Sequence, residues 1–270
     1  MTRHFLRDDD LSPAEQAEVL ALAARLKADP FVMRPLEGPR TVAVISDKPT
    51  LRTQASFSAG IAELGGHAMM VDGKLAQIGI RESVADTARV LGRQAAAIVW
   101  RTGAQERIET MAAYAGVPVV NSLTDAYHPC QTLADLLTMG EHLGGLAGRT
   151  LAFVGDAACN MGHSYVLSAA LAGMHVRVGA PEGYHPDADV VARAEKLAAT
   201  TGGSVTLGTD PAAAVAGADA VATDTWVSMG SEDQAAERER VFADYQVDDA
   251  LVGRARDHAI VLHCLPAYRG

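Results

Sequence analysis

The sequence predicts an α/β fold with two lobes, each a parallel sheet with helices on both faces, and a ligand site in the cleft between them. Short runs rich in β-branched residues alternate with runs of helical periodicity along the whole chain. This alternation is typical of βαβ units with right-handed crossovers, which build parallel sheets. The length of 270 residues also fits about two domains of ordinary size.

The first helix has the clearest start signal. Ser12 suits the N-cap, Pro13 suits the first helical position, and Glu15 completes a capping box. In the rest of this lobe, Phe57 and Ile61 mark the face of a helix that Gly65 and Gly66 close. The alternation predicts strands at 41–46, 67–71, 97–100 and 117–121, and further helices around 82–91, 106–114 and 131–143.

The second lobe repeats the same pattern. Strands are predicted at 150–154, 175–179, 204–207, 219–223 and 259–263, with helices around 161–171, 188–199, 211–216 and 248–255. The lobes join near the helix at 131–143, so the predicted domains are residues 1–140 and 141–270.

Composition and charge exclude several classes of protein. No apolar run approaches the roughly 20 residues that cross a bilayer, and the N-terminus has no apolar stretch of signal-peptide length. The net charge of −10 argues against non-specific binding of nucleic acid. The three cysteines have neither disulfide-like nor zinc-type spacing, which favours a reduced, cytoplasmic compartment and no metal.

Polar residues gather where the predicted strands end, which is where parallel sheets bind ligands. In the first lobe these are the segment 47–53, Arg101, and the segment 128–131. Arginine side chains and a helix N-terminus suit an oxyanion such as phosphate. In the second lobe the strand ends carry 155–160, Asp224 with 228–230, and 263–266. Asn160 and Asp224 suit a zwitterion, because an amide can hold a carboxylate and a carboxylate can hold an ammonium.

Each of these features also has a simpler interpretation. Residues 50–53 could be an ordinary helix cap, Arg101 a surface residue and Cys264 a buried thiol. Likewise, His128 and Asp224 could serve local turns. The joint placement at strand ends favours a functional site. A dinucleotide-binding turn at 154–156 is the weakest alternative, because the glycine fingerprint is missing.

Taken together, the segments resemble a known family. Over essentially its whole length the chain resembles ornithine carbamoyltransferases. The resemblance is carried by His128-Pro129-Cys130-Gln131, by Asp224 with Ser228-Met229-Gly230, and by His263-Cys264-Leu265-Pro266.

The resemblance implies transfer of a carbamoyl group from carbamoyl phosphate to L-ornithine in arginine biosynthesis, by a homotrimer that uses no metal or organic cofactor. Arg101, His128 and Cys264 are the implied catalytic residues, and Gln77 matches a residue that reaches toward a neighbouring subunit's site. The implied ornithine-binding residues are Asn160, Asp224, Ser228 and Met229. The implied carbamoyl phosphate-binding residues are Thr50, Leu51, Arg52, Thr53, Gln77, Arg101, His128, Gln131, Cys264 and Leu265.

The chain departs from the family pattern at three places. The usual Ser-Thr-Arg-Thr loop reads Thr50-Leu51-Arg52-Thr53, so one hydroxyl is lost, and we expect weaker phosphate binding. Cys159-Asn160 stands where the family has paired asparagines. Family members continue beyond the equivalent of Gly270 with another arginine and a closing helix, so the sequence is expected to be a fragment.

The implied mechanism is attack by a neutral amine. Arg101 and His128 would stabilise the tetrahedral oxyanion, and the segment 228–230 would close over the site. Sister enzymes acting on acetylornithine, putrescine or, less favourably, aspartate stay open as alternatives. So does a non-catalytic ligand-binding protein.

Overall fold

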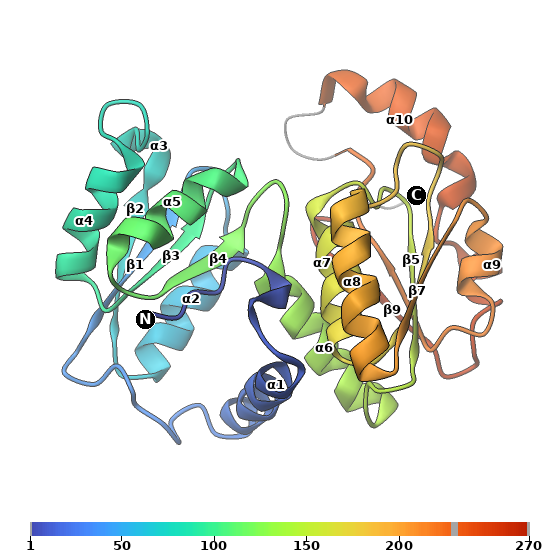
Figure 1. Cartoon of the computed structure of the whole chain (residues 1–270), viewed down its shortest axis with the longest axis horizontal. Helices are drawn as coiled ribbons and strands as arrows, with labels where there is room; N and C mark the ends of the chain where they lie inside the picture. The colour runs from blue at the N-terminus through green and yellow to red at the C-terminus, as the bar shows by residue number, and fades with distance from the viewer. Residues whose placement is uncertain (1, 228–231, 269–270) are drawn as a thin grey trace. The chain divides into compact units, whose positions relative to one another are not determined.

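The computed structural model describes residues 2–227 and 232–268, which form two compact units (Figure 1). The first unit comprises Met1–Leu11 and Glu18–Cys130, and the second comprises Ser12–Ala17 and Gln131–Gly270. Each unit contains one parallel sheet covered by helices, which confirms the predicted α/β class.

The sheet of the first unit has four parallel strands in the order β2-β1-β3-β4. The strands are β1 (Thr41–Ser46), β2 (His67–Asp72), β3 (Ala97–Arg101) and β4 (Val119–Leu123). The chain runs outward from β1 to β2 and then returns to the other side of β1. This reversal puts a topological switch point between β1 and β3, where open α/β sheets bind ligands.

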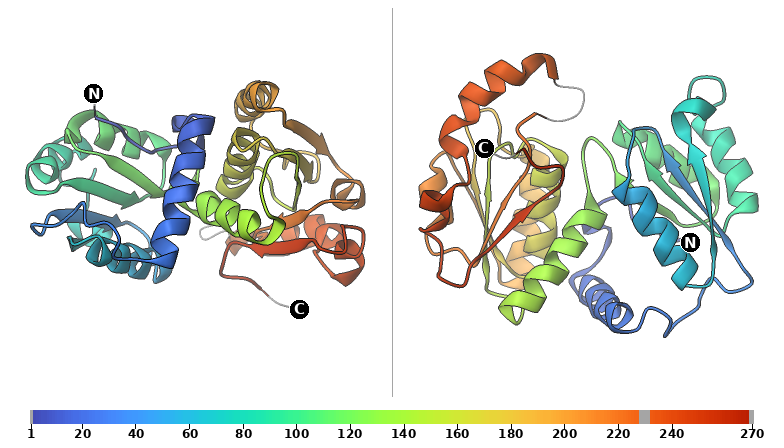
Figure 2. Two further views of the ribbon diagram at one scale, coloured as in Figure 1. Left: turned by 90° about the horizontal axis from the view of Figure 1, so that it is seen from below. Right: turned by 180° about the vertical axis from the view of Figure 1, so that it is seen from behind.

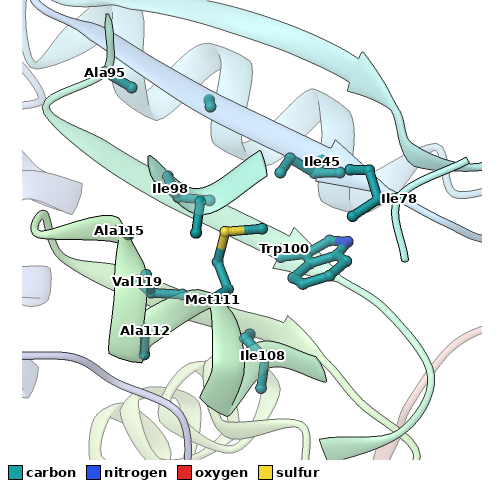
Figure 3. Packing of buried hydrophobic residues seen from close by; sticks show 12 residues of the cluster. Ile45, Ile78, Ala95, Ile98, Trp100, Ile108, Met111, Ala112, Ala115 and Val119 are labelled. Atoms are coloured by element: carbon teal, nitrogen blue, oxygen red, sulfur yellow. The ribbon is translucent and has the colours of Figure 1, made fainter. Parts of the chain in front are cut away.

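Helices cover both faces of this sheet. Val42, Val44 and Val99 pack against Phe57 and Ile61 of α2 (Arg52–Glu63) on one face. The other face packs against α4 (Val84–Gln94) and α5 (Gln105–Ala115), with α3 (Gly73–Ala76) beside the strand ends. Figure 3 shows this second core, where the fully buried Trp100 and Met111 lie with the residues Ile45, Ile98 and Ile108.

The sheet of the second unit has five parallel strands in the order β7-β6-β5-β8-β9, and its switch point lies between β5 and β8. The strands are β5 (Thr150–Val154), β6 (His175–Gly179), β7 (Ser204–Gly208), β8 (Ala220–Thr223) and β9 (Ile260–His263). The helices are α6 (Pro129–Leu143), which belongs to this unit from Gln131 on, α7 (Asn160–Leu171), α8 (Ala188–Thr201), α9 (Pro211–Val215), α10 (Ala235–Phe242) and α11 (Asp249–Val252). The two views in Figure 2 let the reader follow these layers.

One helix of this unit is buried along nearly its whole length. Every residue from Met161 to Leu171 of α7 is buried, because α8 and the sheet enclose it. On the opposite face, Phe242 at the end of α10 packs edge-on against Tyr184 and Tyr245 and stacks with Trp226. Both faces of this sheet are therefore densely packed.

Most predicted elements are confirmed. At the start of α1 (Pro13–Ala28), the Glu15 side chain accepts from the Ser12 N–H at 2.8 Å, as the capping box predicts. The strand predicted at 117–121 begins two residues later as β4, and the helix predicted at 248–255 is only α11, with Asp248 as its cap. Helix α10 was not predicted. In the described part of the chain every helix is too short or too polar to cross a bilayer.

Candidate functional site

The predicted phosphate loop lies at the switch point of the first unit. Residues 47–51 connect β1 to α2, and α2 begins at Arg52. Leu51 occupies the N-cap position with helical backbone angles, and its side chain makes no capping hydrogen bond. The Leu51 side chain is 81% exposed, so the substitution removes a hydroxyl from the loop without filling a core. A helix N-terminus without its own cap retains N–H groups that suit an oxyanion.

Asp47, at the end of β1, is the centre of a hydrogen-bond network beside this loop. Its carboxylate accepts from Trp100 Nε1 at 3.1 Å, from Thr102 Oγ1 at 2.6 Å and from Arg107 at 3.2 Å. Arg107 also donates to the carbonyl oxygen of Ile78 at 2.9 Å and lies over the Trp100 ring. These hydrogen bonds therefore hold the segment 73–79 against the ends of β1 and β3.

Gln77 lies in the segment 73–79 and has a left-handed backbone conformation. Its φ of 53° is unusual for a residue with a side chain, and such strain persists only where the surroundings impose it. Two glycines allow the close fit around it. A Cβ on Gly73 would lie 2.0 Å from Asp47 Oδ1, and one on Gly79 would lie 2.7 Å from an Arg107 nitrogen.

Replacing Gly73 by alanine is therefore expected to displace the segment that carries Gln77. We expect the KM for the substrate that binds beside this segment to rise by about tenfold or more, the effect of losing a hydrogen bond to a charged group. Gly60→Ala in α2 is the matched control, because an added Cβ there meets no atom within 4 Å. Steady-state kinetics of both variants test this, and an unchanged KM in folded Gly73→Ala would contradict it.

Arg101 and His128 form the second polar feature of the first unit. Arg101 ends β3, and His128 immediately precedes α6 (Pro129–Leu143). Burial lowers the pKa of His128 to about 3, and the positive charge of Arg101 acts in the same direction. His128 is therefore neutral at physiological pH, so that a guanidinium cation and an uncharged imidazole lie near each other.

Cys130 and Gln131 follow in the first turn of α6. The Cys130 thiol donates to the Asn121 carbonyl oxygen, and burial raises its pKa to about 12, so it is not a thiolate nucleophile. Gln131 donates from Nε2 to Asp135 Oδ1 at 3.1 Å. The predicted residues 50–53, Arg101 and His128 thus all lie at strand ends of the first unit. Gln131 belongs to the second unit.

In the second unit, the loop at 155–159 leads from β5 to Asn160, the first residue of α7. Gly155 has a φ of +119° and lies against Thr223 and Trp226. A Cβ on Gly162 would lie 2.2 Å from the carbonyl oxygen of Ala157, so only glycine lets the first turn of α7 approach this loop. The backbone therefore fixes the position of Asn160.

Asp224 directly follows β8, across the switch point from this loop. Burial raises the pKa of Asp224 to about 7; a hydrogen bond from the Thr225 N–H lowers it, and the negative charges of Asp156 and Asp135 raise it. Asp156 itself forms an ion pair with Arg238 of α10. Asp224 is thus a desolvated carboxyl group near two other acids, which is an environment that favours binding of a cation.

The last predicted segment follows β9. His263 hydrogen bonds through Nδ1 to the carbonyl oxygen of Cys264 at 2.7 Å, Cys264 is half-buried, and the Leu265–Pro266 peptide is cis. Burial of Tyr165 raises its pKa, and the neighbouring charges of Asp135, Cys264 and Asp224 act in the same direction. This places Cys264 near the acidic residues of the second unit. Ser228 and Met229 lie outside the described residues.

Three side-chain pairs were not predicted as pairs, although Asp47 and Asp156 fall in the predicted segments 47–53 and 155–160. The pairs are Asp47 with Arg107, Asp135 with Tyr165, and Asp156 with Arg238. Only one of them had a local signal. Asp135 lies four residues after Gln131 on one helix, and this spacing brings an amide and a carboxylate together. In the described part of the chain, no three His, Cys, Asp or Glu side chains cluster in a way that could hold a metal ion.

Comparison with known proteins identifies the class to which this fold and these strand ends belong. The profile of the aspartate/ornithine carbamoyltransferase carbamoyl-P binding domain matches residues 3–141, and that of the Asp/Orn binding domain matches residues 147–270. The chain belongs to the aspartate/ornithine carbamoyltransferase family.

Its relatives point to the ornithine branch. The chain is 61% identical over 269 residues to ornithine carbamoyltransferase of Clavibacter sepedonicus and 57% identical over 270 residues to that of Mycobacterium ulcerans. Each alignment covers 100% of this chain and 88% of the relative.

Solved structures of ornithine carbamoyltransferases also resemble the chain over nearly its whole length. Ornithine carbamoyltransferase from Pyrococcus furiosus superimposes with a TM-score of 0.95 at 41% identity, covering 99% of this chain and 86% of the other. Anabolic ornithine carbamoyltransferase from Campylobacter jejuni gives 0.93 at 34% identity, covering 100% and 88%.

Proposed function

We propose that the chain transfers the carbamoyl group of carbamoyl phosphate to the side-chain amine of L-ornithine, giving L-citrulline and phosphate. One observation carries the proposal: the residues at the strand ends of the two sheets differ in charge. Those of the first unit carry Arg52, Arg101 and His128, whereas those of the second carry Asp224 beside two further acids. The first set suits a phosphorylated substrate and the second suits a cationic amino acid.

In the proposed carbamoyl phosphate site, the phosphate binds Thr50, Arg52, Thr53 and the N–H groups at the start of α2. These N–H groups need no side-chain hydroxyl, so Leu51 weakens this binding without abolishing it. Gln77 adds an amide, and Gln131 and Leu265 contact the carbamoyl group.

The proposed reaction is direct nucleophilic attack. The neutral amine nitrogen of ornithine bonds to the carbamoyl carbon, and the carbonyl electrons move onto oxygen. Arg101 stabilises this oxyanion by charge, and His128, which is neutral, stabilises it by donating an N–H. The carbon–oxygen bond to phosphate then breaks, phosphate leaves with the electron pair, and the departing phosphate accepts the proton that the attacking nitrogen loses.

The same residues explain the proposed choice of acceptor. Asn160 holds the α-carboxylate and Asp224 the α-ammonium, while Ser228 and Met229 close over the amino acid and Cys264 lies beside the reacting amine. Acetylornithine has no α-ammonium for Asp224, and putrescine has no carboxylate for Asn160. Either loss leaves a buried polar group without its ligand, which costs affinity.

We further propose a cytoplasmic homotrimer that serves arginine biosynthesis, with carbamoyl phosphate bound by residues 1–140 and ornithine by 141–270. The three cysteines form no disulfide, which fits a reducing compartment. The exposed Gln77 is flanked by Leu75 and Ile80, which are 83% and 81% exposed, and such apolar exposure favours a subunit contact there.

A substrate panel tests the proposal. Phosphate release is measured with carbamoyl phosphate and, in turn, ornithine, acetylornithine, putrescine and aspartate. We expect release with ornithine to exceed that with any other acceptor by about a hundredfold or more, with stoichiometric citrulline. Preference for another acceptor would assign a sister activity. Binding of both substrates without turnover would indicate a non-catalytic protein.

A further inference from the structure

We propose that Asp135 is a positioning residue that orients the Gln131 amide toward the carbamoyl group and is itself held by Tyr165. The inference rests on the proposed function, because it concerns how that function's carbamoyl phosphate site is arranged. Sequence resemblance implied a role for Gln131 but for neither Asp135 nor Tyr165.

The three side chains form a continuous chain of hydrogen bonds within the second unit, from the half-buried Gln131 to the buried Asp135 and Tyr165. Gln131 Nε2 donates to Asp135 Oδ1 at 3.1 Å, and Tyr165 Oη donates to Asp135 Oδ2 at 2.7 Å. Asp135 is 8% exposed and Tyr165 is 1% exposed. The Tyr165 ring packs against the buried Phe153 with centroids 5.5 Å apart, which restricts its position.

The chemistry of these groups sets the direction of the Gln131 amide. A carboxylate only accepts hydrogen bonds, so the amide must turn its NH₂ group toward Asp135. The Gln131 carbonyl oxygen is then left to face another donor. The carbamoyl group carries an NH₂ of its own, and its two N–H bonds need acceptors in a site otherwise built from donors. Gln131 supplies that acceptor only in this orientation.

Asp135 also acts on the amino-acid half of the site. Its negative charge is one cause that raises the pKa of Asp224 to about 7, together with burial and the charge of Asp156. The other groups that interact with Asp224 are the Thr225 N–H, the Cys159 thiol and the Tyr165 hydroxyl, while Arg238 pairs with Asp156. Removal of the Asp135 charge should therefore shift the ionisation of Asp224 to lower pH. This shift reports loss of the charge itself, whereas the KM for carbamoyl phosphate reports the orientation of Gln131.

The test uses Asp135→Asn and Tyr165→Phe, with Glu141→Gln on the same helix as the control because Glu141 is exposed. Asparagine places an NH₂ group where Asp135 has only acceptors, and the Gln131 amide is no longer fixed. We expect the KM for carbamoyl phosphate to rise by about tenfold in Asp135→Asn, with a smaller fall in kcat, and less change in Tyr165→Phe. Glu141→Gln should match the wild type.

The second readout is the pH dependence of binding of L-norvaline, which has the carbon skeleton of ornithine without the side-chain amine. Its midpoint should move to lower pH in Asp135→Asn and stay near the wild-type value in Tyr165→Phe, which keeps the carboxylate. If Asp135→Asn does not fold, Tyr165→Phe still decides: an unchanged KM in that variant overturns the proposal.

Failure of the proposed function and failure of this inference give different experimental results. A wild-type protein that does not form citrulline overturns the proposed function and this inference with it. An active wild type whose folded Asp135→Asn variant keeps its KM for carbamoyl phosphate overturns the positioning role alone.

Discussion

Replacing Arg101 by alanine is expected to lower kcat by about 10²- to 10³-fold while changing the KM for carbamoyl phosphate far less. The reason is that the guanidinium meets full negative charge only when the carbonyl oxygen becomes an oxyanion. Loss of one donor of this kind typically costs that much in kcat. Because His128 is neutral, the imidazole cannot replace the missing charge. Steady-state kinetics with carbamoyl phosphate varied at saturating ornithine measure both constants.

Arg89→Ala is the control for this experiment. Arg89 is exposed, pairs with Asp86 at 2.6 Å and stacks over Tyr114, and it lies on α4 away from the strand ends. We expect its kinetics to match the wild type. A large rise in KM with kcat intact in Arg101→Ala would mean that Arg101 holds the ground state only, and the assigned role would then be wrong.

The second large effect is expected on ligand affinity, because pH changes the ionisation of Asp224. Only the ionised carboxylate can pair with an α-ammonium, and the pKa of Asp224 is raised to about 7. Affinity for L-norvaline should therefore be highest above pH 7 and fall by about tenfold for each pH unit below it. Norvaline separates this effect from ionisation of the reacting amine, which ornithine would add near pH 10.4. Calorimetry across pH 5 to about 9 measures it.

Asp224→Asn provides the matched variant. It should bind norvaline about 30- to 100-fold more weakly at pH 8, and its affinity should vary little with pH.

The effect of pH on the free energy of unfolding has the opposite sign to its effect on norvaline affinity. Because folding raises this pKa above 3.8, the unliganded protein should lose stability as pH rises from about 4 to 7, and the variant should lose less. A wild-type norvaline affinity that is flat between pH 5 and 8 would contradict the assignment.

Much of the fold could be predicted because local signals and packing agree. The first β-strand and the strands at 150–154 and 175–179 have the predicted bounds, since each is a short β-branched run buried by helices on both faces. Helix α10 escaped prediction because its sequence is highly charged, and only its last residue, Phe242, is buried. Its reason for folding is long-range, in the contacts of Phe242 and Arg238.

The positions of the candidate residues could be predicted, but their electrostatics could not. The strand-end rule placed Arg101, His128 and Asp224 correctly because it depends on topology alone. Nothing in the sequence indicates that His128 is neutral or that Asp224 titrates near pH 7. Both properties arise from desolvation by residues distant in the chain. The same holds for Gln77, whose strained backbone is imposed by glycines that fit against Asp47 and Arg107.

The central claim is that the strand ends of the first unit bind an anion and those of the second unit bind a zwitterion. A crystal structure with carbamoyl phosphate and norvaline bound tests it most directly. We expect the phosphate on Arg52 and the N–H groups at the start of α2, the carbamoyl oxygen near Arg101 and His128, and norvaline on Asn160 and Asp224. Carbamoyl phosphate bound elsewhere, or norvaline bound without contact to Asp224, would contradict the claim.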